Sequence, residues 1–150
     1  LTPHKTITLV GAFQLYIRRL SETGNKLYVL ELNEKALTDG QRQFYVPASE
    51  YQRVLPDSDI VILTGLSLVN RTMDSLLSEI PPESVTVVSG PSGSVIPDIM
   101  FENNVDIIGA TRITNPQRLF DLVSEAGAGY HLFRYCAQKI CILRDNERGA

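Results

Sequence analysis

The residues of this chain that could do chemistry gather in five short segments, each directly after an apolar run. In every segment the sequence changes from apolar to small, hydroxyl or amide residues. Glycine lets a ligand approach the backbone closely, and the free N–H groups at a helix N-terminus favour an anion. The segments therefore indicate a crevice for a small polar ligand, with an anion favoured. They occupy residues 11–13, 31–33, 64–72, 89–94 and 109–114.

Two arginines in these segments, Arg71 and Arg112, could pair with an anionic group of the ligand, with ordinary surface charge as the alternative. We expect Asn70 or Thr72 to cap the helix that follows its segment. The Ser/Gly segment 89–94 could be only a turn, but its place after a buried strand favours binding. The predicted ligand-binding residues are Gly11, Phe13, Glu31, Thr64, Gly65, Ser67, Asn70, Thr72, Gly90, Pro91, Ser92 and Arg112.

The first segment lacks the glycine pattern of an ordinary dinucleotide site. Such a site needs G-x-G-x-x-G, but Phe13 stands where the second glycine would let a pyrophosphate touch the backbone. Glu31 nevertheless follows Gly11 by 20 residues, the position of the acid that holds a ribose in nucleotide-binding proteins. A solvated surface carboxylate explains Glu31 equally well. A nucleotide- or S-adenosylmethionine-dependent transferase therefore stays open as the alternative to a binding domain.

Catalytic and metal-binding motifs are missing from the sequence. It contains no H-E-x-x-H, G-x-S-x-G or Walker pattern, and the five segments contain no obvious general base. His131 and Cys136 could form a soft-metal pair, but two ligands are too few for a closed zinc site. Cys141 lies in an apolar strand pattern and is expected to be a small buried hydrophobe. The sequence therefore supports no catalytic residue, and whether the chain is an enzyme stays open.

The elements that must position the segments are strands alternating with amphipathic helices. This alternation predicts right-handed βαβ units and one α/β domain over residues 1–150, doubly wound and Rossmann-like. Its three layers would hold a mostly parallel sheet of five to six strands, with a long loop over 33–47. In such sheets ligands bind at the carboxyl ends of the strands, near the point where the strand order reverses. The expected strands are 6–10, 27–32, 59–63, 85–88, 105–108 and, as a sixth candidate, 139–143.

The last predicted helix starts at Asn115, as N-cap, with Pro116 in its first turn. An apolar stripe of Leu119, Leu122, Val123 and Ala126 continues it. A third interpretation of the chain is an assembly unit, in which the first or the sixth strand forms a dimer edge and gives a homo-oligomer.

Composition excludes several classes of protein. The chain has 150 residues, 14 Lys and Arg against 17 Asp and Glu, a net charge of −3 and 43% apolar residues. The apolar content excludes general disorder, and the lack of a basic excess argues against nucleic-acid binding. No apolar stretch approaches the roughly 20 residues of a membrane span. Two cysteines are too few for a disulfide framework, so the cytoplasm is the expected compartment. A start at Leu1 suggests one part of a longer polypeptide.

Two long motifs resemble one known family. TGLSLVNRTMDSLL (64–77) and SGPSGSVIPDIMFENNVDIIGATRITNP (89–116) are similar to segments of the "putative heavy-metal chelation" domain family, whose function is unknown. Gly11–Phe13 and the LEL at 30–32 resemble two shorter motifs of that family. Leu66 and Ser67 stand where the family usually has two threonines, Arg71 where it has glycine, and Ser94 where it has proline. Arg71 adds a charge that changes or blocks the ligand.

The resemblance implies a Rossmann-like C-terminal domain that follows an N-terminal domain resembling that of enolase, with the site between the two. It also implies the binding or handling of a heavy metal or a metal-containing small molecule. Heavy metals prefer Cys and His, whereas the crevice segments offer oxygen ligands and N–H groups. Either the N-terminal domain supplies soft ligands, or this domain holds an organic anion that carries the metal. We favour the second interpretation.

Overall fold

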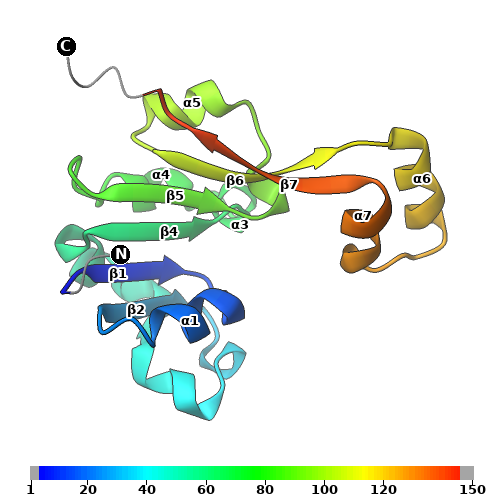
Figure 1. Cartoon of the computed structure of the whole chain (residues 1–150). Helices are drawn as coiled ribbons and strands as arrows, with labels where there is room; N and C mark the ends of the chain where they lie inside the picture. The colour runs from blue at the N-terminus through cyan, green and yellow to red at the C-terminus, as the bar shows by residue number, and fades with distance from the viewer. Residues whose placement is uncertain (1–3, 146–150) are drawn as a thin grey trace.

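The computed structural model describes residues 4–145 as one twisted sheet with helices on both faces (Figure 1). The strand order is β3-β2-β1-β4-β5-β6-β7, and every pairing is parallel except that of β6 with β7. The order reverses between β1 and β4, because the chain first builds outward from β1 to β3 and then returns to β4. The strands are β1 Thr6–Val10, β2 Lys26–Glu31, β3 Tyr45–Pro47, β4 Ile60–Thr64, β5 Val85–Ser89, β6 Ile107–Ile113 and β7 Ala137–Leu143.

The helices are short. The α-helices are α1 Gln14–Leu20, α2 Tyr51–Val54, α3 Leu66–Val69, α4 Met73–Leu77, α5 Pro97–Glu102, α6 Pro116–Ser124 and α7 Gly129–Tyr135. The 3₁₀ turns are η1 Glu34–Ala36, η2 Asp39–Phe44, η3 Ala48–Glu50, η4 Leu55–Asp57 and η5 Pro91–Gly93.

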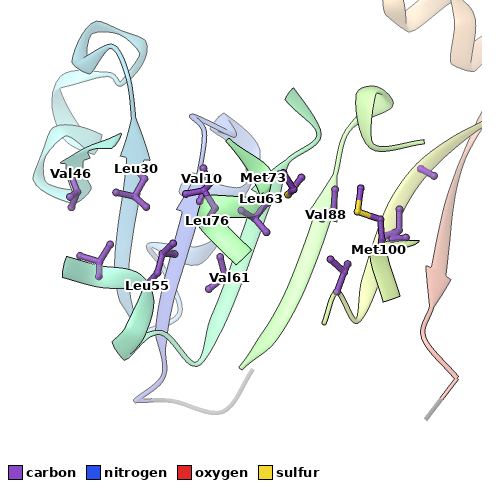
Figure 2. Packing of buried hydrophobic residues seen from close by; sticks show 14 residues of the cluster. Val10, Leu30, Val46, Leu55, Val61, Leu63, Met73, Leu76, Val88 and Met100 are labelled. Atoms are coloured by element: carbon purple, nitrogen blue, oxygen red, sulfur yellow. The ribbon is translucent and has the colours of Figure 1, made fainter. Parts of the chain in front are cut away.

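Alternation along the strands divides the core into two clusters on opposite faces of the sheet. On β1, Ile7 and Leu9 face α1 and pack near Ile17, while Val10 belongs to the larger cluster on the other face. Figure 2 shows this larger cluster, in which Met73 and Leu76 of α4 lie over the central strands and Met100 of α5 lies near Val88. Helices thus hold the central strands from both sides, which fixes the strand ends that carry the predicted segments.

The predicted fold class is confirmed, with corrections of detail. The described sheet has seven strands rather than five to six, because residues 33–47 are not one loop: they hold η1, η2 and the edge strand β3. The first strand is not an edge, since β1 lies between β2 and β4, whereas the last strand is an edge. Residues 109–113 continue β6 instead of forming a loop, because β7 pairs with β6 along its whole length.

The last two helices stand away from the sheet (Figure 1). Asn115 caps α6 as predicted, with its side chain accepting a hydrogen bond from the Arg118 N–H, and Pro116 lies in the first turn. No residue of α6 or α7 is buried, and Val123 of the predicted apolar stripe is 60% exposed. The stripe therefore does not cover the sheet of its own chain.

Candidate functional site: a cleft where the strand order reverses

One cleft of about 840 Å³ opens at the carboxyl ends of β1, β2 and β4. It lies at the reversal of strand order between β1 and β4, where doubly wound sheets bind ligands, and its volume is typical of small-molecule sites. Seven of the predicted residues line this cleft: Gly11, Phe13, Glu31, Thr64, Ser67, Asn70 and Thr72.

Gly11 makes the tight turn that follows β1, beside the end of β4. Its φ is +106°, a conformation that favours glycine, and its N–H donates to the Leu30 carbonyl at 2.9 Å. A Cβ at this position would lie 3.3 Å from Thr64 Cγ2. Phe13 follows and stacks on Tyr16 with 5.3 Å between ring centroids, so it forms a rigid aromatic wall of the cleft.

The Glu31 carboxylate is not free, because it accepts hydrogen bonds from nearby backbone N–H groups. Its Oε2 accepts the Ala12 N–H at 2.9 Å, and its Oε1 accepts the N–H groups of Leu32 and Asn33 at 2.8 and 3.2 Å. Backbone donors stabilise the carboxylate charge. Glu31 thus occupies the Ala12 N–H in the turn between β1 and α1, a donor that an anionic ligand would otherwise use.

The turn after β4 supplies most of the polar groups of the cleft. Ser67 is only 3% exposed, and its carbonyl accepts both the N–H and the hydroxyl of Thr72, at 2.9 and 3.4 Å. The expected side-chain cap is therefore wrong: Thr72 is the N-cap of α4, but its hydroxyl donates back to Ser67, and Asn70 ends α3 through its backbone N–H. The Thr64 hydroxyl accepts the Leu66 N–H at 3.3 Å.

Arg71 is the cationic side chain of the cleft wall. Its φ is +58°, uncommon for any residue but glycine, and its N–H donates to the Leu68 carbonyl at 3.2 Å. Within residues 4–145 its guanidinium has neither an ion-pair partner nor a hydrogen-bond partner. The cleft wall thus includes an arginine without a partner in the described residues. Its one carboxylate, Glu31, already accepts three N–H groups.

Gly65, Gly90, Pro91 and Ser92 build the loops beside the cleft and do not line it. A Cβ on Gly65 would come within 2.8 Å of Gly93 Cα and of the Ser92 carbonyl carbon. The Gly65 N–H also donates to the Ser89 carbonyl at 2.9 Å. The turns after β4 and β5 therefore pack on each other, backbone against backbone, and this contact explains the glycine at position 65.

Arg112 and the two cysteines lie outside the cleft. Arg112 is exposed on β6, opposite Gln138 of β7. Cys136 is buried, but Cys141 is exposed, so the expectation of a buried Cys141 is wrong. In the part of the chain that the structure describes, no three His, Cys, Asp or Glu side chains come together as a metal site would require.

The sequence did not reveal the side of the cleft that the segment after β3 forms. Ala48, Ser49 and Tyr51 line it from the segment that follows β3. Because β3 has only three residues, the sequence predicts no strand there and hence no carboxyl end on this side of the cleft. The polar-after-apolar pattern at 45–49, YVPAS, was the available signal.

Comparisons with known proteins agree with this fold. The family model DUF364, described as "putative heavy-metal chelation", matches residues 1–142. The chain belongs to this family. The DUF364 match confirms the resemblance seen in the two long motifs. Across residues 4–145, no helix has the length and apolarity of a membrane span.

Two solved structures are DUF364 proteins of unknown function. The protein from Pyrococcus horikoshii superposes with a TM-score of 0.80 at 21% identity, over 96% of this chain and 57% of that one. The protein from Desulfitobacterium hafniense gives 0.74 at 23% identity, over 95% and 54%. An uncharacterized protein of Methanocaldococcus jannaschii is 28% identical over 110 residues, 73% of this chain and 41% of that protein. This chain thus spans about two fifths to three fifths of these relatives, and the two structures share its fold.

The residues of the cleft do not fit a soft heavy metal held directly by the protein. Such metals prefer thiolate and imidazole ligands, and the cleft wall contains neither Cys nor His. Its single carboxylate already accepts three backbone N–H groups. Hydroxyl, amide and guanidinium groups remain, and these bind anions rather than soft cations.

Proposed function

We propose that this domain binds a small organic anion in the cleft between β1 and β4. The proposal rests on one observation: Arg71 lines the cleft, and its guanidinium has no ion-pair or hydrogen-bond partner in residues 4–145. A guanidinium binds carboxylate or phosphate through two parallel hydrogen bonds, and a free one in a concave site favours an anionic ligand.

The remaining wall indicates the shape of this ligand. Phe13, Tyr51 and Leu66 supply aromatic and aliphatic surface, while Asn70 and Ser49 supply short polar groups. Pockets of this composition bind ligands that have an apolar body and a few oriented polar groups. An aromatic or branched carboxylate, or a phosphate ester of similar size, matches this description.

Heavy-metal handling enters the proposal through the ligand. An organic anion that already coordinates a metal would bring its own donor atoms, so the cleft needs only to bind the organic part. This reconciles the family description with a wall that has neither thiolate nor imidazole. The cytoplasm stays our proposed compartment, and the two free thiols accord with its reducing conditions.

A second candidate, a nucleotide- or S-adenosylmethionine-dependent transferase, is favoured by the position of Glu31 at the end of β2. It requires the carboxylate to exchange backbone N–H groups for ribose hydroxyls. Calorimetric titration with adenosine compounds tests it. Binding that is lost in Glu31→Ala would favour the transferase, whereas no heat with any adenosine compound would count heavily against it.

The anion proposal is tested by thermal-shift screening of carboxylates, phosphates and their metal complexes, followed by calorimetry on the best ligand. Arg71→Gln removes the charge and is expected to weaken binding about 10- to 100-fold, the value of a charge-assisted hydrogen bond. Arg112→Gln is the matched control, because Arg112 is exposed outside the cleft. If the two variants bound the ligand with the same affinity, the proposal would be contradicted.

A further inference from the structure

The two edges of the sheet differ in how they are protected against pairing with another strand. β3 has only three residues and ends on Pro47, which has no N–H to donate. β7 has seven residues, no proline and one charged side chain, Lys139. Lys139 is therefore the single protective residue of β7, and a long edge strand with so little protection is a template for another strand.

The ladder between β6 and β7 defines which groups of β7 face outward. The Thr114 N–H donates to the Cys136 carbonyl at 2.8 Å, and the Arg144 N–H donates to the Asp106 carbonyl at 2.9 Å. Because hydrogen-bonded and non-bonded pairs alternate in an antiparallel ladder, the even-numbered residues of β7 bond to β6. The backbone groups of Ala137, Lys139, Cys141 and Leu143 therefore point to the open edge.

We propose that β7 pairs antiparallel with β7 of a second copy of this chain, with Ile140 on the two-fold axis. This register pairs all seven residues of each strand, and the two Ile140 residues form a non-hydrogen-bonded pair. Lys139 then faces Cys141 of the second copy. A register centred on Lys139 would instead place two like charges opposite each other, which destabilises a sheet.

Charge complementarity supports a second copy as the partner. Residues 110–140, which we call the arm, hold the projecting ends of β6 and β7 together with α6 and α7 (Figure 1). The arm contains four Lys or Arg and two Asp or Glu, a net charge of +2. Since the whole chain carries −3, the rest of the chain carries −5. The same chain thus offers both halves of a complementary contact.

The antiparallel pairing brings these opposite charges together. β7 runs against the other strands, so β7 of the second copy starts at the amino-terminal edge of the first sheet and brings its arm there. Glu83, before β5, and Glu102, at the end of α5, lie at that edge and form no ion pair within residues 4–145. The contact would also cover apolar side chains of the arm such as Phe120 and Tyr130, each 69% exposed. The dimer does not depend on what the cleft binds.

Sedimentation equilibrium of the 150-residue chain tests the assembly, and disulfide trapping tests the register. In a Cys141→Ser background, Ile140→Cys should form an intermolecular disulfide on mild oxidation, because about 4.5 Å separates the Cα atoms of such a pair. Ile142→Cys is the matched control. Ile142 lies on the same face of β7 as Ile140, but in this register it pairs with Gln138 of the second copy, so the two 142 positions are too far apart for a disulfide. A monomer at all concentrations, or equal trapping at both positions, would overturn the proposal.

A pair of charge variants at exposed Cys141 provides a test that does not disturb the core. Cys141→Lys would face Lys139 of the second copy twice per dimer and should weaken the dimer about 2- to 30-fold. Cys141→Glu should strengthen it by a similar factor. A dissociation constant that is the same in both variants would overturn the register even if a dimer forms.

Discussion

Gly65 lies at the contact between the turns after β4 and β5, and its replacement by alanine tests that contact. An added Cβ would come within 2.8 Å of Gly93 Cα and of the Ser92 carbonyl carbon, and closer still to the Gly93 nitrogen. Carbon atoms prefer about 3.5–4.0 Å, so the backbone must move by about 1 Å. Overpacking typically costs about 1–3 kcal/mol, and we expect about 3 kcal/mol because no flexible side chain can give way.

The free energy of unfolding in urea measures this cost. With a urea m-value of about 1–3 kcal/mol/M, Gly65→Ala should lower the midpoint by about 1–3 M. Gly40→Ala is the matched control: an added Cβ there meets nothing within 4 Å, so stability should stay the same or rise by up to about 1 kcal/mol. If Gly65→Ala were as stable as the parent chain to within about 0.5 kcal/mol, the packing of the two turns would be refuted.

Three further predictions concern strain, buried polar groups and pH. Arg71→Gly should raise the free energy of unfolding by about 1 kcal/mol, because the φ of +58° suits glycine. The same variant should bind the anion more weakly. A variant no more stable than the parent chain would contradict the backbone strain at Arg71. Ser58→Ala should cost about 1–3 kcal/mol, because it leaves the buried Thr8 hydroxyl without its 2.7 Å partner. Adding Thr8→Val should restore part of that loss, and a purely additive double variant would refute the coupling. The Lys5 ammonium and the Thr6 N–H hold the pKa of Asp59 below its ordinary value of 3.8. A lowered pKa stabilises the fold above the unfolded-state pKa, and this contribution is lost as the pH falls through the folded-state value. Asp59→Asn should therefore be less stable at pH 7 and lose less stability on acidification; parallel urea midpoints from pH 7 to pH 2 would argue against this.

The sequence predicts the central sheet well because its strands and helices have clear periods. Thr6–Val10, with apolar residues on both faces, is where its pattern places it. α6 begins at Pro116, as the predicted cap at Asn115 indicates. β3 escaped prediction because Val46 is its only buried residue, and a three-residue edge strand depends on its neighbour for stability. Strand direction also lies outside a local pattern, so the antiparallel β7 could not be foreseen.

The position of the cleft was predictable from the sequence, whereas the contacts of its lining residues were less so. The reversal of strand order follows from the fold, and it places Gly11 beside Thr64. Tertiary contacts decide the rest: Gly90 belongs to a loop that packs beside Gly65, and Glu31 binds backbone N–H groups from two turns. Similarly, the spacing of Leu119 and Val123 predicts an amphipathic helix but not which surface it faces.

The most direct test of the central claim is the position of a bound organic anion in a crystal. A brominated aromatic carboxylate such as 4-bromobenzoate gives an anomalous signal that locates the ring. The account predicts a bromine peak in the cleft between β1 and β4, with the carboxylate on the Arg71 guanidinium, and no such peak in crystals of Arg71→Gln. A ligand found only outside the cleft, or an unchanged peak in the variant, would contradict it.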